Sequence, residues 1–218
     1  MTAHPSPACP SPLQLSPGDA DALLFDLGRV VINIDFTKVL ACWAGYASCA
    51  PSDIAARFAA DEIYFDHERG KVTDEEFFDN LRRLLGIAIT DEQFLEGWNS
   101  IFAGEMDGIV PLLERASQHL PLYAFSNTNR AHIAAFTRDY AEVLKPFREI
   151  YLSSTIGLRK PDAEAFDHVV NAMGVPASRI VFFDDLADNV ESARSLGIKA
   201  VQVKSSRDIA DALTALGV

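Results

Sequence analysis

From residue 109 to residue 216 the sequence alternates between short apolar runs and segments of helical length. The pattern predicts strands at residues 122–125, 150–153, 180–184 and 200–203, and helices at 109–119, 130–140, 162–173, 187–196 and 207–216. Strands that are separated by single helices need crossover connections, so they form a parallel sheet. These strands carry Val, Ile, Phe and Leu with little alternation, as buried parallel strands do. We therefore expect an α/β fold.

One further strand precedes this region, and a helical segment separates the two. The apolar run Ala22–Asp26 predicts a buried strand. Residues 35–104 instead show helical spacing, with Asp35 as an N-cap at the first helix and no strand expected. Capping boxes at residues 73–76 and 90–93 mark two more helix starts. The expected division is a core at residues 19–34 plus 105–218 and an insert at residues 35–104.

Composition limits the partners and the compartment. The chain has 218 residues and a formal net charge of −12, which disfavours nucleic acid and anionic membranes as partners. No segment approaches the ~18 apolar residues of a membrane span. Its three cysteines are typical of reduced thiols, so we expect a cytoplasmic protein. We expect it to be a monomer or a homodimer. Residues 1–18 are rich in Pro and Ser, lack the pattern of a signal peptide, and predict a flexible tail.

Polar side chains follow four of the predicted strands. They are Asp26, the pair Ser126 and Asn127, Lys160 before Pro161, and the pair Asp184 and Asp185. In an open parallel sheet, ligands bind at the carboxyl ends of the strands. Each group has an ordinary alternative as a turn residue or a helix cap. Their joint occurrence at successive strand ends favours a shared site.

The residue types predict phosphoryl transfer. Carboxylates brought close together repel one another unless a cation holds them, and an all-oxygen ligand set favours Mg²⁺. The Ser126 hydroxyl and backbone N–H groups at a helix start suit a phosphate oxygen. Lys160 adds a positive charge, and Pro161 is expected at the first helical position, which would direct Lys160 at the site.

The chain resembles the haloacid dehalogenase-like hydrolase superfamily from about residue 21 onward. The stretches that carry the resemblance are "FDLGRVVINID", "HERGKVTDEEF", "SNTNR", "GLRKPDAEAF" and "FFDDLADNVESARSLG". Within it, the pattern is most similar to bacterial α-D-glucose-1-phosphate phosphatases, which also carry Asp-Leu-Gly at the first motif. The resemblance implies a Rossmann-like core with helices on both faces, an all-helical cap at residues 35–104, and a Mg²⁺-dependent phosphatase. The implied substrate is a small phosphorylated metabolite, such as a sugar 1-phosphate.

The resemblance also implies roles for individual residues. They are Asp26 as the nucleophile, Ser126 and the Asn127 backbone on the phosphate, Lys160 orienting both, and Asp26, the Gly28 carbonyl, Asp184 and Asp185 around Mg²⁺. In the insert, Arg69 is expected on a turn before Gly70, either contacting the substrate or lying in solvent. Asp188 is expected to support the metal ligands, and Trp98 to pack in the core.

The sequence departs from the wider superfamily at Gly28. Most phosphatases of the superfamily have an Asp there, which protonates the leaving oxygen. A glycine cannot supply this acid–base help, so we expect substrates whose leaving oxygen departs readily as an anion. Three alternatives remain open: a haloacid dehalogenase, a phosphoglucomutase-type enzyme, and a non-catalytic binding protein.

Overall fold

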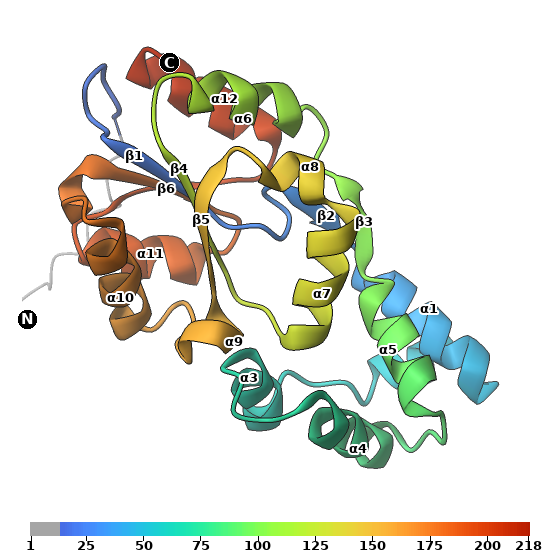
Figure 1. Cartoon of the computed structure of the whole chain (residues 1–218). Coiled ribbons are helices and arrows are strands. Elements are labelled where there is room, and N and C mark those ends of the chain that lie inside the picture. The colour runs from blue at the N-terminus through green and yellow to red at the C-terminus, as the bar shows by residue number, and fades with distance from the viewer. Residues whose placement is uncertain (1–13) are drawn as a thin grey trace, which may run out of the picture.

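The computed structural model describes residues 14–218, and its core is a five-stranded parallel sheet (Figure 1). The strands are β1 (Ala22–Phe25), β4 (Leu122–Ser126), β5 (Phe147–Leu152), β6 (Ile180–Asp184) and β7 (Lys199–Gln202). Their order is β5-β4-β1-β6-β7, and every neighbouring pair runs parallel. The predicted α/β fold with a parallel sheet is confirmed, and β1 is its central strand.

Helices cover both faces of this sheet. On one face lie α6 (Ile109–Ser117), α7 (Arg130–Asp139), α8 (Ala141–Leu144) and α12 (Ser206–Leu216), and on the other lie α10 (Ala163–Met173) and α11 (Ala187–Ser195). Two shorter elements, α9 (Ser153–Ile156) and a 3₁₀ turn at Ala177–Arg179, lie in the connections. Alternate residues of β1 supply the two apolar cores: Leu23 faces the first helix layer and Leu24 the second. A strand covered on both faces has to be apolar throughout, which explains the uninterrupted run.

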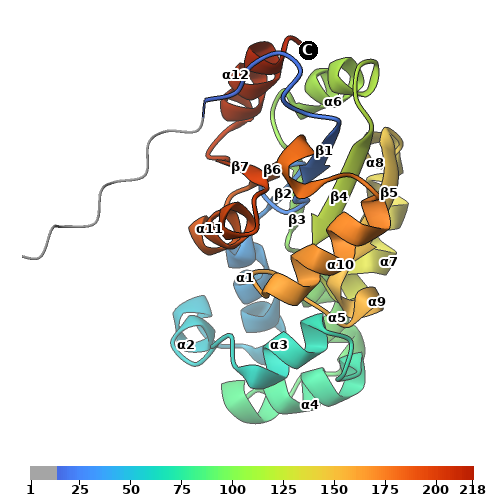
Figure 2. The same cartoon turned by 90° about the vertical axis from the view of Figure 1, so that its left-hand side faces the viewer.

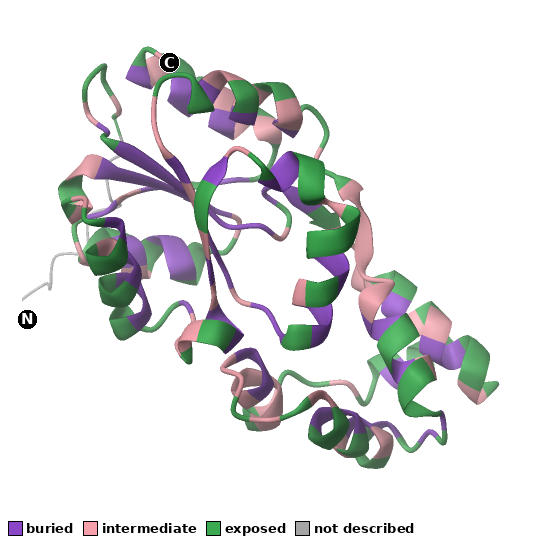
Figure 3. Ribbon diagram, viewed as in Figure 1, coloured by how far each residue is buried: buried purple, intermediate pink, exposed green. Residues whose placement is uncertain are grey.

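The central strand ends at Asp26. All four residues of β1 are fully buried (Figure 3), and the ring of Phe25 stacks on Phe183 at 4.7 Å between centroids. The backbone N–H of Asp26 donates to the Phe183 carbonyl at 2.8 Å, so the strand pairing extends one residue past β1. The sheet therefore fixes the position of the Asp26 backbone.

Residues 35–104 contain five helices. They are α1 (Phe36–Ala47), α2 (Pro51–Ala55), α3 (Glu62–Glu68), α4 (Asp74–Leu85) and α5 (Asp91–Asn99), which lie together at one end of the sheet (Figure 2). Asp35 caps α1, and the predicted capping boxes start α4 at Thr73 and α5 at Thr90. These helices share a third apolar cluster centred on Trp43 and Trp98, whose indoles stack at 5.8 Å. That the segment is a separate cap domain stays a prediction.

The structure differs from the sequence expectations in several local elements. A two-stranded antiparallel sheet of β2 (Ile32–Ile34) and β3 (Phe102–Glu105) flanks the helical segment, where no strand was expected. Runs this short carry too little pattern to be recognised. Helix α2 ends at Ala55, and the chain then turns so that Phe58 packs on Phe36. The turn expected before Gly70 is largely helical, since α3 includes the two residues before Arg69.

The described part of the predicted tail lies against the core. Leu15 packs on the first apolar cluster, and the Gly18 carbonyl accepts a hydrogen bond from Arg179. Residues 1–13 lie outside the described part of the chain, so a flexible tail stays a prediction there. Among the described helices, none is both long and apolar enough to cross a membrane.

His132 joins α7 to α5 in the core. Its Nδ1 accepts from the Asn129 side chain, and its Nε2 donates to the Trp98 carbonyl, both at 3.1 Å. This is the hydrogen-bonding pattern of a neutral imidazole. Burial lowers the pKa of His132 to about 4. The charged form is therefore excluded from the folded protein near neutral pH.

His132 should make the free energy of unfolding fall as the pH drops from 6.5 toward 4. Because its pKa is lower in the folded state, the unfolded chain takes up the proton first, which favours unfolding. Between pH 7 and pH 5, the wild type should lose about 1–2 kcal/mol more than His132→Asn, measured by urea unfolding. His119→Asn, at an exposed position, should follow the wild type. Equal pH dependence of wild type and His132→Asn would contradict this.

Two helix glycines provide a matched test of packing between α1 and α5. A Cβ on Gly97 would overlap the Trp43 indole, whereas one on Gly45 would meet open space. We expect Gly97→Ala to lower the free energy of unfolding by about 1–3 kcal/mol through overpacking. Gly45→Ala should raise it by up to about 1 kcal/mol, because Ala favours helix. Chemical denaturation of both variants measures the difference, and equal effects would exclude the close contact.

Candidate active site

A buried lysine ties together two carboxylates from different strands. The Lys160 Nζ donates to Asp26 Oδ1 and to Asp184 Oδ2, each at 2.7 Å, and to the Phe125 carbonyl at 2.8 Å. The lysine is 1% exposed, and all three of its ammonium protons therefore have acceptors. Burial acts to lower the pKa of Lys160, but attraction by the two carboxylates outweighs it and raises the pKa. Lys160 is held in its charged form.

Three carboxylates meet at this point. Ligand oxygens of Asp26, Asp184 and Asp185 all lie within 4.8 Å of one another. Burial raises the pKa of Asp26 to about 7, with Lys160 opposing it and Asp184 adding to it. Burial and then Asp184 also raise the pKa of Asp185. Fully ionised, the three carboxylates would leave two negative charges uncompensated by the one ammonium. A divalent cation with oxygen ligands fits this deficit and this donor set.

The two aspartates of the pair differ in surroundings. Asp184 is fully buried, and its oxygens accept from the Asn189 amide at 3.0 and 3.1 Å and from the Leu186 N–H at 2.9 Å. Asp185 is half-buried and lines the cavity. Asp188 was expected to support this pair, but it is exposed, and its neighbour Asn189 has the role. The helix rotates about 100° per residue, so adjacent positions face different sides.

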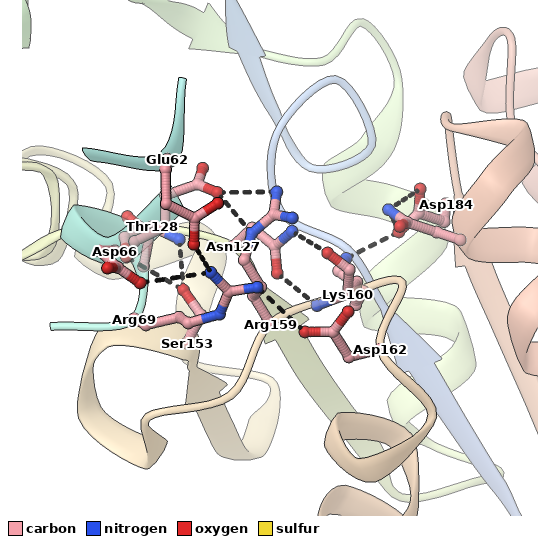
Figure 4. A network of polar contacts seen from close by, with 12 residues as sticks. Glu62, Asp66, Arg69, Asn127, Thr128, Ser153, Arg159, Lys160, Asp162 and Asp184 are labelled. Atoms are coloured by element: carbon pink, nitrogen blue, oxygen red, sulfur yellow. Dashed lines mark hydrogen bonds and ion pairs between the residues drawn. The ribbon is translucent and has the colours of Figure 1, made fainter. Parts of the chain in front are cut away.

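Lys160 is positioned by a side chain and not by a helix start. The Asn127 amide accepts from the Lys160 N–H at 2.9 Å and donates to the Lys160 carbonyl at 2.8 Å (Figure 4). The expectation that Pro161 is the first helical residue is wrong. Pro161 lies in a turn closed by the Asp162 N–H and the Arg159 carbonyl, the Lys160–Pro161 bond is cis, and α10 begins at Ala163.

The strand ends open into one cavity of about 410 Å³. Its lining includes Asp26, Gly28, Ser126, Asn127, Lys160 and Asp185, so these predicted site residues are brought together. Ser126 is buried at the end of β4, and α7 begins only at Arg130, with Asn129 as its N-cap. The backbone that follows Ser126 is therefore a loop and not a helix start.

Arg69 lies outside this lining. Its guanidinium pairs with Asp162 at 3.3 Å, Asp66 at 3.4 Å and Glu62 at 3.6 Å (Figure 4). It links α3 to the turn before α10, so its predicted contact with substrate is not supported by its position.

A second ion pair, which the sequence did not predict, does line the cavity. Arg159 Nε and Nη2 both lie 2.9 Å from Glu68 Oε2, and the guanidinium stacks over the Phe65 ring at 4.5 Å. Burial raises the pKa of Glu68, and Arg159 opposes this. The sequence signal that could have identified Arg159 was its position next to Lys160, since neighbours of a buried functional residue also lie near the site.

Comparisons with known proteins agree with this geometry. A D-ribitol-5-phosphate phosphatase of Bacteroides thetaiotaomicron is 27% identical over 203 residues, covering 89% of this chain and 97% of that protein. A solved HAD family enzyme from the same organism, in complex with magnesium and inorganic phosphate, has a TM-score of 0.75 at 29% identity, covering 85% of this chain and 95% of that one. A HAD-like family hydrolase from Porphyromonas gingivalis shares the fold at a TM-score of 0.77 and 22% identity, covering 91% and 98%.

A sequence model of the haloacid dehalogenase-like hydrolases matches residues 21–197, which includes every strand-end residue described above. The strand order and the position of the carboxylates agree with this family match. The chain is therefore a hydrolytic enzyme that belongs to the haloacid dehalogenase-like hydrolase family.

Proposed function

We propose that this hydrolase is a Mg²⁺-dependent phosphatase that cleaves a small phosphate monoester through an aspartyl-phosphate on Asp26. The observation that carries the proposal is the convergence of three carboxylates and the Lys160 ammonium, of which Asp26, Asp185 and Lys160 line one cavity. A named phosphatase among the relatives, and a similar enzyme solved with magnesium and inorganic phosphate, support it.

Asp26 is placed to act as the nucleophile. Its Oδ1 accepts from Lys160, so Oδ2 is the oxygen left to attack phosphorus. Attack forms the O–P bond while the bond from phosphorus to the leaving oxygen breaks. Lys160 and the Ser126 hydroxyl are proposed to hold the phosphoryl oxygens. Water then hydrolyses the acyl phosphate, which releases inorganic phosphate and restores the Asp26 carboxylate.

The metal ligands are proposed to be the Asp26 and Asp185 carboxylates and the Gly28 carbonyl. Asp184 has its oxygens engaged by Lys160, Asn189 and the backbone, so it serves to anchor Lys160. Bound Mg²⁺ would supply positive charge that neutralises the phosphate oxygens. A metal-free haloacid dehalogenase is not favoured, because it has no need for Asp185 beside an anionic substrate.

Gly28 restricts the leaving group. Gly28 lines the cavity two residues after Asp26, and a glycine has no side chain that could donate a proton. We propose that the enzyme acts on esters whose oxygen leaves readily as an anion, namely sugar 1-phosphates, acyl phosphates and aryl phosphates. That the substrate is a sugar 1-phosphate, as the sequence implies, stays a prediction within this set.

Replacement of Asp26 should abolish hydrolysis of p-nitrophenyl phosphate. The amide of Asp26→Asn cannot form the phospho-enzyme, so we expect a loss on the order of 10³-fold or more. Activity of the wild type should also disappear with EDTA and return with added Mg²⁺. Asp188→Asn, at an exposed position near the site, is the matched control and should retain activity. Turnover by Asp26→Asn would exclude Asp26 as the nucleophile.

The missing acid at Gly28 should appear as a preference between two isomeric substrates. Glucose 1-phosphate and glucose 6-phosphate have the same size and charge, but the anomeric oxygen is the better leaving group. We expect a higher kcat for glucose 1-phosphate, measured by release of inorganic phosphate. A clear preference for glucose 6-phosphate would refute the leaving-group argument and leave the nucleophile untouched.

A further inference from the structure

Away from the carboxylates, the cavity is walled by aromatic rings. The lining rings are Phe36, Phe58, Tyr64, Trp98, Phe102, His132 and Phe136, and we call them the aromatic wall. Most come from the helical segment and β3, and the last two from α7. Ile32, Ile34 and Ile101 extend the same apolar surface. The cavity therefore has a charged end and an apolar end.

The rings of the aromatic wall pack against one another. Phe36 and Phe58 lie 4.6 Å apart between centroids, Phe58 and Tyr64 6.3 Å at 89°, Tyr64 and Trp98 6.2 Å at 85°, and Trp98 and Phe36 6.4 Å at 90°. Edge-to-face packing of this kind makes a continuous surface and not an open cage. It favours a flat apolar group over an enclosed cation.

The Trp98 indole is 2% exposed, so it leaves little surface for stacking a sugar. One face of its indole stacks on Trp43 at 5.8 Å, and the His132 imidazole stacks on it at 4.8 Å. The lowered pKa of His132 keeps that ring neutral at pH 7, so it adds to the apolar surface. The half-buried rings of Phe36 and Phe58 are left to contact a ligand.

Several polar side chains of this end already have partners. Glu68 pairs with Arg159, while Asn129 is engaged by His132. In the described residues, the Trp98 Nε1 is a buried donor of this wall without a partner. A polyol brought here would leave most of its hydroxyls without hydrogen bonds, which costs more than apolar burial returns.

From these observations we infer that the substrate is an aryl phosphate, the phosphate monoester of a phenol. The inference rests on the proposed function and selects one of its three ester classes. Asp26 forms the bond to phosphorus, the bond from phosphorus to the aryl oxygen breaks, and the phenolate leaves with the electron pair. The phenolate needs no proton from the enzyme, which agrees with Gly28, and its ring lies on the aromatic wall. A phosphate monoester of a cationic alcohol such as choline would instead need an acid to protonate its leaving alkoxide. Its positive charge would also meet the Arg159 guanidinium.

The test compares esters that differ in the group placed on the aromatic wall. Steady-state kcat/KM is measured with Mg²⁺ for 2-naphthyl phosphate, phenyl phosphate, glucose 1-phosphate and acetyl phosphate. We expect kcat/KM to decrease from 2-naphthyl phosphate to phenyl phosphate and from phenyl phosphate to glucose 1-phosphate. Phe58→Ala should lower kcat/KM for 2-naphthyl phosphate by roughly 10–100-fold, mainly through KM. Acetyl phosphate, which reaches only the charged end, should lose much less kcat/KM than 2-naphthyl phosphate in this variant.

Binding without turnover separates ring recognition from leaving-group chemistry. Calorimetry with Mg²⁺ should show phenylphosphonate binding the wild type more tightly than methylphosphonate, and Phe58→Ala should remove the difference. Phe58→Leu should retain part of it, and Leu95→Ala, an exposed apolar residue outside the cavity, should retain all of it.

Two results would overturn the inference alone: a higher kcat/KM for glucose 1-phosphate than for the aryl esters, or an equal loss on acetyl and naphthyl phosphate in Phe58→Ala. Absence of Mg²⁺-dependent phosphate release from all four esters would instead overturn the proposed function, and the inference with it.

Discussion

The site depends on one buried ion cluster, the Lys160 ammonium between the carboxylates of Asp26 and Asp184. An isolated charge at 1% exposure would be too costly to bury, so each member requires the others. The cluster is nevertheless incomplete in charge, because Asp185 adds a third carboxylate. Its geometry therefore both stabilises the lysine and prepares a position for a divalent cation. Structure and reactivity arise from the same electrostatic requirement.

The parallel sheet makes this cluster possible. Strands β1, β4 and β6 are neighbours that run in one direction, so the residues at their carboxyl ends meet although they are far apart in sequence. The backbone of Asp26 is fixed by its pairing to Phe183, and the backbone of Lys160 by the amide of Asn127. Rigid elements thus hold the charged end, while the helical segment supplies the opposite, apolar wall of the same cavity.

That opposite wall gives the cavity its second character. The helices of residues 35–104 bury a shared aromatic cluster, and part of the same cluster faces the cavity. Rings that pack the helical segment therefore also line the cavity, as Trp98 does while its indole stacks on Trp43. The Arg159–Glu68 pair joins this segment to the residue next to Lys160.

The sequence by itself determined the parallel sheet, the capping boxes at Thr73 and Thr90, and the identity of the strand-end residues, because these follow from local patterns and from a repeated connection rule. Tertiary structure decided the rest. It placed Asn189 and not Asp188 beside Asp184, held Lys160 by Asn127 and not by a helix start, and put Arg159 in the cavity lining in place of Arg69. These outcomes depend on distances between segments far apart in the chain, and local periodicity carries no information about such distances.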